Sequence, residues 1–92
     1  MAILGTLDIS GLSQAQFESI ARDVGTSTQL AAGNLFRAAL PIVGGWRVIS
    51  AWESLELFQT YMRERLQPAF ERAGREPTRI EVAPLAEVRT AF

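Results

Sequence analysis

Two tryptophans six residues apart are the side chains of this sequence whose spacing best suits ligand chemistry. Trp46 and Trp52 lie in the segment GGWRVISAWES, residues 44–54. If this segment is a strand, side chains two apart share a face, so Val48 and Ser50 lie between the two indoles. Such a surface is aromatic and poor in charge, which suits a flat hydrophobic molecule. The alternative is that both indoles are ordinary core, since aromatic side chains on strands usually pack.

Few polar side chains are placed to orient such a molecule. Asp8 shares the strand alternation of Thr6 and is a candidate base, because burial raises the pKa of a carboxyl. Its alternative roles are a strand-end cap or a solvated acid. Trp52 carries an indole N–H that can stabilise an anion. We therefore expect Trp52 and Asp8 as catalytic residues, and we expect the following substrate-binding residues: Thr6, Phe36, Trp46, Val48, Ser50, Phe58 and Met62.

Missing residue types narrow the chemistry further. The chain has no Cys, no His and no Lys. This excludes a Cys or Ser–His nucleophilic site, a Schiff-base lysine, and a haem or zinc held by histidine. The acidic residues show no paired spacing typical of a metal or glycosidase site, and there is no G-x-G-x-x-G fingerprint. We expect no metal and no cofactor, so the substrate must do much of the chemistry.

Charge and length indicate the partners. The net charge is −1 and the arginines are scattered from Arg22 to Arg89, which argues against nucleic acid. No apolar run is long enough to span a membrane, and the N-terminus lacks the basic region of a signal peptide, so a cytoplasmic protein is expected. The 92 residues form one domain, 1–92, too short to bury all its apolar surface. A homodimer is therefore expected.

Hydrophobic periodicity predicts the elements that position these side chains. A capping box at Ser13 and Gln16 begins the first helix, and Ser54 caps the second. Gly44 and Gly45 suggest a hairpin turn. Pro68 predicts a helix break near Gln67. The expected strands cover 2–9, 35–43, 46–52 and 78–88, and the expected helices cover 13–24 and 55–73.

The order β-α-β-β-α-β is the ferredoxin-like plan, an α+β fold with an antiparallel sheet. Both helices cover one face, and the other apolar face would be covered by the sheet of a second copy. Arg37 and Arg47 are unusual in apolar strands: they form ion pairs with Glu53, Glu81 or the other subunit, or they bind an anion at a pocket mouth. A two-residue turn and a bulged one predict opposite faces for these arginines.

The element order, the length and the segment GGWRVISAWESLELFQTYMRERLQPAF together resemble the antibiotic biosynthesis monooxygenase family of dimeric α+β barrels. The shared marks are a strand ending in W-E-S, a helix opening directly after it, and R-L-x-P before a last helical turn. Members include cofactor-free oxygenases of aromatic polyketides and haem-degrading oxygenases, and related barrels include polyketide cyclases. The resemblance implies a site role for Trp52, the tryptophan of W-E-S.

The chain departs from the family pattern at other positions. Polyketide oxygenases of the family carry an asparagine at Val48, a tyrosine at Phe58 and a histidine near Ala38. The haem-degrading members need a histidine on the second helix, and its absence argues against haem degradation.

The resemblance implies a small cofactor-independent enzyme that acts on a hydrophobic aromatic or polyketide-like substrate, and a monooxygenase is the first expectation. A polyketide cyclase or isomerase of the same fold is one alternative, because cyclisation needs mainly orientation of the substrate. A non-catalytic small-ligand carrier or interaction domain is the other. The departures from the family pattern favour a cyclase or the carrier, whereas Trp52 and the expected cavity favour a cofactor-free enzyme, either oxygenase or cyclase.

Overall fold

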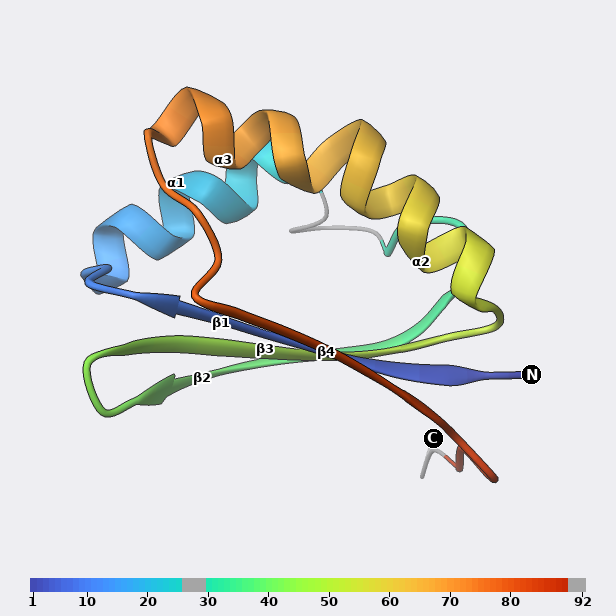
Figure 1. The fold of residues 1–92 in the computed structure, drawn as a ribbon. Coiled ribbons are helices and arrows are strands. Elements are labelled where there is room, and N and C mark those ends of the chain that lie inside the picture. The colour runs from blue at the N-terminus through green and yellow to red at the C-terminus, as the bar shows by residue number, and fades with distance from the viewer. Residues whose placement is uncertain (26–29, 90–92) are drawn as a thin grey trace.

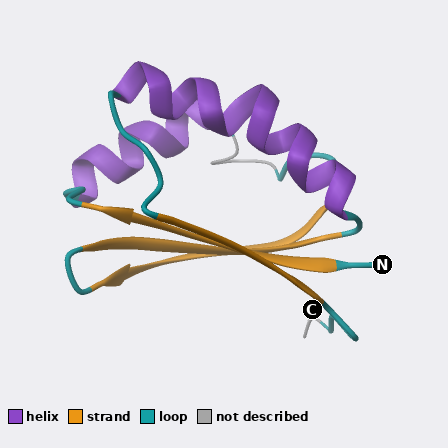
Figure 2. Cartoon of the chain, in the orientation of Figure 1, coloured by secondary structure: helices purple, strands orange, loops and turns teal. Residues whose placement is uncertain are grey.

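A computed structural model of the chain describes residues 1–25 and 30–89. It confirms the predicted β-α-β-β-α-β order and the α+β ferredoxin-like class, with both helical segments on one side of the sheet (Figures 1 and 2). None of the described helices is long and apolar enough to cross a membrane. The elements are β1 (Ile3–Ser10), α1 (Gln14–Val24), β2 (Asn34–Ile42), β3 (Gly45–Trp52), α2 (Leu55–Tyr61), η1 (Met62–Leu66), α3 (Gln67–Ala73) and β4 (Arg79–Pro84).

The four strands form one antiparallel sheet in the order β2-β3-β1-β4. β1 and β3 are therefore central, and β2 and β4 are the edges. Pro41 is tolerated within β2 because an edge strand has one side free of ladder hydrogen bonds. Pro84 pairs with Ile3 as the last pair between β4 and β1.

The first helix begins as predicted. The hydroxyl of Ser13 accepts a hydrogen bond from the backbone N–H of Gln16 at 3.2 Å, and the Gln16 side chain accepts one from the backbone N–H of Ser13 at 2.9 Å. Gly25 ends the helix in the left-handed conformation. Residues 26–29, between the first helix and β2, lie outside the described residues, and β2 begins at Asn34, one residue before the expected strand.

The hairpin between β2 and β3 turns at Val43 and Gly44, not at the Gly44–Gly45 pair. Gly44 takes a φ of 79°, whereas Gly45 is the first residue of β3 and pairs with Ile42. Gly45 is constrained by space instead: a Cβ there would lie 2.1 Å from the backbone oxygen of Ile9 on β1.

The resulting register places the two strand arginines on opposite faces of the sheet. Arg37 lies across from Ser50, on the side of the helices. Arg47 lies across from Asp8, on the side that no helix covers. The sequence left this choice open because it depends on how the hairpin turns.

The second helical segment has no break at Gln67, contrary to the prediction. It runs continuously from α2 through a π-helical turn, η1, into α3, which Gly74 ends (Figure 1). The backbone N–H of Gln67 bonds to the carbonyl of Met62, five residues back. A wider turn just before Pro68 relieves the clash between the proline ring and the preceding turn, so the helix continues.

The wider turn also keeps three apolar side chains aligned. Met62, Leu66 and Phe70 follow one another at intervals of four residues. In a regular α-helix of 3.6 residues per turn, each such step drifts by about 40° around the axis. A π-helical turn in the middle of this run offsets the drift, so all three side chains face the sheet.

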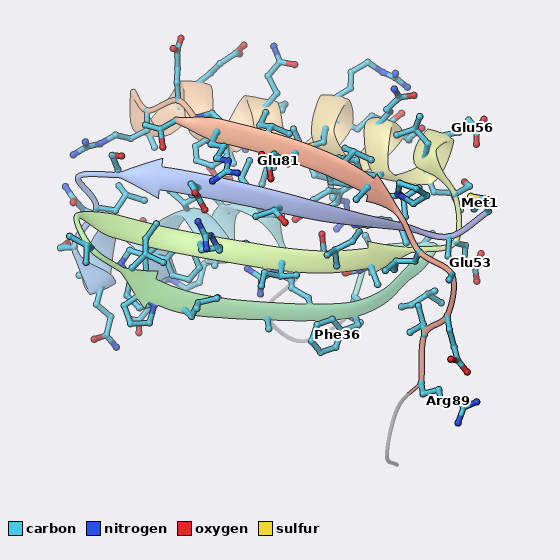
Figure 3. The ribbon with its side chains drawn as sticks, turned by 60° about the horizontal axis from the view of Figure 1, so that its bottom comes forward. Met1, Phe36, Glu53, Glu56, Glu81 and Arg89 are labelled. Carbon is cyan, nitrogen blue, oxygen red and sulfur yellow. The ribbon has the colours of Figure 1, made fainter. Side chains whose placement is uncertain are left out.

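The face of the sheet without helices is only partly apolar, which corrects the expectation of a wholly apolar face. Figure 3 shows this face, with Phe36 on β2 and Glu81 on β4 labelled. One end of it is apolar, whereas the other carries charges. The side chains that the register places on this face are Leu4, Thr6, Asp8, Phe36, Ala38, Leu40, Arg47, Ile49, Ala51, Arg79, Glu81 and Ala83.

The two hairpin glycines are expected to differ in their tolerance of alanine. Gly44→Ala should lower the free energy of unfolding by about 1–2 kcal/mol, because only the left-handed backbone opposes it and no atom lies within 4 Å of its Cβ. Gly45→Ala should cost about 3 kcal/mol or more, because the Cβ meets the backbone of β1. Urea unfolding followed by tryptophan fluorescence measures both, and equal costs would contradict this register.

Candidate functional site

A cavity lies between the helix-covered face of the sheet and the helices above it. Its floor comes from β1, β2 and β3, and its roof from α1, α2, η1 and α3. The side chains are mostly apolar and aromatic, and the floor also carries polar groups. The lining residues are Gly5, Leu7, Ile9, Phe17, Ile20, Ala21, Val24, Asn34, Arg37, Val48, Ser50, Trp52, Phe58, Tyr61, Met62, Leu66 and Phe70.

The free space in this cavity is small, about 40 Å³. A single water needs about 10–15 Å³ of such space, so the cavity admits a few waters and no aromatic ring. Met62, Leu66 and Phe70 also line a larger groove of about 310 Å³, between the second helical segment and Ile80 of β4. These three side chains separate the cavity from the groove, so a flat ligand enters only if they move.

The indole of Trp52 is held by a polar contact on the cavity floor. Trp52 is 1% exposed, and its Nε1–H donates a 2.8 Å hydrogen bond to the hydroxyl oxygen of Ser50. The two residues are two apart on β3 and therefore share a face. The N–H that was expected to stabilise an anion directly is thus already engaged. Ser50 keeps its own hydroxyl proton, which it can donate to a molecule in the cavity that it lines.

Two aromatic rings of α2 pack against Trp52. The centroid of the Phe58 ring lies 5.7 Å from that of Trp52, and the centroid of the Tyr61 ring lies 4.9 Å away, both tilted. Gly5 on β1 lies directly under Phe58, since a Cβ there would come within 2.9 Å of the ring. The sequence interpretation missed Gly5, although a glycine within a strand often marks such a close approach.

Five of the expected site residues surround this cavity: Val48, Ser50, Trp52, Phe58 and Met62. Trp46 shares their sheet face but does not line the cavity. Its ring stacks on Phe17, with centroids 4.6 Å apart and planes 7° apart. Trp46 therefore packs as core, which was the alternative interpretation for this residue.

Phe36 lies on the opposite face, contrary to the expectation that it lines the cavity. From Ile42 back to Phe36, β2 keeps the register that the two-residue turn sets, with Arg37 opposite Ser50 and Phe36 opposite Ala51, so Arg37 faces the helices and Phe36 points away. A bulge before Phe36, two residues against one, brings Asn34 opposite Trp52 and so onto the helix side as well. The expected face of Phe36 was wrong because it depends on how the hairpin turns, which alternation within one strand does not reveal.

Thr6 and Asp8 also lie on the face away from the cavity. Alternate residues of β1, Gly5, Leu7 and Ile9, line the cavity, so the even-numbered positions face the other way. Thr6 pairs with Ile49 of β3, whose side chain also points away from the helices. Neither residue contributes to the cavity, which corrects their expected roles.

Asp8 is held by an arginine instead of being poised as a base. Arg47 donates two hydrogen bonds to its carboxylate, from Nε at 2.7 Å and from Nη2 at 2.9 Å. These bonds lower the pKa of Asp8 below its ordinary value. Burial opposes this shift, and the charges of Arg47 and Arg79 support it. The expected raised pKa was wrong because the register supplies a guanidinium that the sequence could not place.

Among the described residues that line the cavity, Arg37 is the one that carries a charge. It is half-buried and pairs across the strands with Ser50. The amide of the nearby Asn34 donates to the backbone oxygens of Phe36 and Ala51, at 2.9 and 2.8 Å, across the bulge. No acid lines the described part of the cavity, so no carboxylate there neutralises Arg37.

Comparison with known proteins finds solved structures that share this fold. No protein-family model and no curated protein matches the chain. A putative antibiotic biosynthesis monooxygenase from Chloroflexus aurantiacus J-10-fl matches with 9% identity over 98% of each chain and a TM-score of 0.70. One from Deinococcus radiodurans matches with 17% identity over 100% of this chain and 99% of the other, with a TM-score of 0.66.

A third solved structure is that of a mutant of SnoaB, a cofactor-independent oxygenase from Streptomyces nogalater. It shares 14% identity over 95% of this chain and 94% of the other, with a TM-score of 0.65. At such identities, structural similarity establishes the fold alone. The resemblance inferred from the sequence is therefore confirmed as a shared architecture.

Replacing Asp8 tests the ion pair and its pH dependence. Because the folded-state pKa is lowered, the ionised carboxylate stabilises the fold above its unfolded pKa of about 3.9 and loses this effect as pH falls through the folded value. Asp8→Asn should therefore destabilise the protein at pH 6–8 (about two or more units above that pKa), and the difference from wild type should shrink in acid.

Asp23→Asn is the matched control, because Asp23 also accepts two hydrogen bonds from an arginine, Arg72, but is more exposed. Its effect should be smaller, since water screens the pair. Urea unfolding across pH measures both variants. If the free energy of unfolding of the wild type instead falls as the pH rises from 5 to 8, and Asp8→Asn removes that fall, the pKa of Asp8 is raised.

Proposed function

We propose that this chain binds a flat aromatic molecule in the cavity and oxygenates it without a cofactor. The observation that carries the proposal is the Ser50 hydroxyl, positioned by the Trp52 indole on the floor of a cavity walled by aromatic rings. The fold similarity to a cofactor-independent oxygenase supports the same reaction class. The proposed substrate is a polyketide-like phenol or anthrone.

The absence of acids among the described lining residues decides which substrates fit. No carboxylate there can remove a proton, so the substrate must itself be acidic enough to lose a proton to water. The resulting carbanion or enolate is electron-rich and reduces O2. Carbon–oxygen bond formation and protonation give a hydroperoxide, and loss of water leaves a carbonyl. A methylene group and O2 thus become a ketone and water.

The residues of the cavity have separate roles in this proposal. The Ser50 hydroxyl donates to the oxygen on which negative charge accumulates, which is worth most in a site that excludes water. The Trp52 N–H holds that hydroxyl in place. Phe58, Tyr61 and Met62 cover the ring and exclude solvent. Entry requires Met62, Leu66 and Phe70 to move, so that the cavity joins the outer groove.

Oxygen uptake by chelator-treated protein with an anthrone-type substrate tests the reaction. Ser50→Ala should lower kcat about a hundredfold, with a smaller effect on ligand affinity, because it removes one donor to the developing anion. Thr6→Ala is the matched control, since it removes a hydroxyl from the opposite sheet face. The rate should rise as pH approaches the pKa of the substrate.

The other outcomes distinguish the alternatives. Product formation without O2 uptake would replace the oxygenase by a cyclase. Saturable quenching of tryptophan emission by aromatic ligands, with no turnover of any phenol, anthrone or linear polyketide mimic, would leave a carrier. A Ser50→Ala variant as active as wild type would refute the role of Ser50.

We also propose that the chain is a homodimer that covers the uncapped sheet face. Phe36 is 42% exposed and Leu40 is 36% exposed on that face, beside Leu4, Ala38 and Ile49. A contiguous apolar patch of this kind is typical of an interface. The ion pair of Asp8 with Arg47 is satisfied within one chain and so leaves fewer unpaired charges to bury.

Light scattering at micromolar concentration should give twice the chain mass of 10.1 kDa. Phe36→Asp should shift the protein to monomers, because it buries an unpaired charge in the interface. Val43→Asp, at the exposed hairpin tip, is the matched control and should remain dimeric. A folded wild-type monomer at this concentration would refute the dimer.

A further inference from the structure

Arg37 is a cation that the described part of the protein leaves without an acidic partner. The ion pairs there involve Arg47, Arg72, Arg79 and Arg89, and Arg37 takes part in none of them. The undescribed residues 26–29 and 90–92 contain no Asp or Glu. Arg37 is half-buried beside this largely apolar cavity. An anionic group of a ligand would supply the counter-charge that the described residues do not.

The neighbours of Arg37 specify what such a ligand looks like. Ser50 is its direct cross-strand partner on the same face, so their Cβ atoms are about 4.5–5.5 Å apart. A guanidinium and a hydroxyl at this spacing can both donate to one anionic oxygen. Trp52 and Phe58 lie beyond Ser50, where an aromatic ring attached to that oxygen would pack.

We infer that Arg37 makes this cavity selective for aromatic molecules that carry an anionic oxygen, a phenolate or enolate, held between the Arg37 guanidinium and the Ser50 hydroxyl. The inference rests on the proposed function in taking the cavity as the substrate site. Arginine stays protonated at every physiological pH, and its planar fork presents parallel N–H donors. Its partial burial makes the attraction stronger than it would be in water.

This selectivity also supplies the reactive form of the substrate. If the site binds the phenolate more tightly than the neutral phenol, linkage lowers the pKa of the bound ligand, by one unit for each tenfold preference. The proton passes to water, and the anion remains beside Arg37. A site without a carboxylate base therefore raises the fraction of bound substrate that is ionised at a given pH.

The test uses 2-hydroxyanthraquinone, whose phenolate absorbs at longer wavelength than the phenol, and its neutral 2-methoxy analogue. Wild-type protein should lower the pKa of the bound hydroxy probe by about one unit or more. Arg37→Gln should abolish this shift and weaken phenolate binding about ten- to a hundredfold, because one charge-assisted interaction is lost. Quenching of tryptophan emission by the methoxy analogue should be unchanged.

Two further variants separate charge from structure. Arg37→Lys should retain part of the shift, since it keeps the charge but not the fork. Arg63→Gln, which removes an exposed arginine from η1, should retain all of it. Far-UV circular dichroism verifies that each variant is folded.

The outcomes distinguish this inference from the proposed function. An unchanged probe pKa in wild type, or an Arg37→Gln variant that weakens both ligands alike, overturns the role of Arg37 while the cavity remains a ligand site. A lowered probe pKa without any oxygen uptake supports the role of Arg37 and refutes the oxygenase. Failure of both probes to bind overturns the inference together with the proposed site.

Discussion

The Asn34 side chain spans the bulge in β2, donating hydrogen bonds to the backbone of Phe36 at 2.9 Å and of Ala51 on β3 at 2.8 Å. The bulge lies before Phe36 and brings Asn34 opposite Trp52, on the helix side of the sheet. From Phe36 to the hairpin, β2 keeps the register set by the turn at Val43 and Gly44, in which Arg37 faces the helices and Phe36 faces away. The polarity of the cavity, the apolar patch on the open face and the separation of Arg37 from Asp8 all depend on this register.

The same register divides the charges of the sheet between its two sides. Asp8 and Arg47 meet across β1 and β3 on the open face and neutralise one another. The cavity side receives hydrogen-bond donors, from Arg37 and Ser50, and no carboxylate among its described lining residues. A site of this composition stabilises negative charge but does not generate it by proton abstraction. The chemistry that suits it begins with a substrate that ionises readily.

The helices above the sheet are fitted to it by two adjustments of the backbone. The π-helical turn before Pro68 lets one helix continue and keeps Met62, Leu66 and Phe70 directed at the sheet. Gly5 lets the Phe58 ring lie directly on β1. Together they reduce the free space of the cavity to about 40 Å³. Met62, a flexible side chain, separates the cavity from the outer groove together with Leu66 and Phe70.

The sequence by itself determined the order of the elements, because each carries a local signal. The capping box at Ser13 and the cap at Ser54 depend on residues a few positions apart, and the structure confirms them. Alternation along β3 likewise brought Val48, Ser50 and Trp52 to one face, where the structure has them. Missing residue types restricted the chemistry without reference to any fold.

Only the tertiary structure decided which side chains meet across strands. Asp8 was expected in the cavity with a raised pKa, yet its pKa is lowered, because Arg47 is 39 residues away in sequence and adjacent in space. The sequence led us to expect Phe36 on the wrong face of the sheet, and it did not assign Arg37 to either face. The hairpin turn sets these faces through the backbone pairing of β2 with β3, and a shift of one residue reverses every side chain on a strand. No local pattern in the sequence distinguishes the two registers.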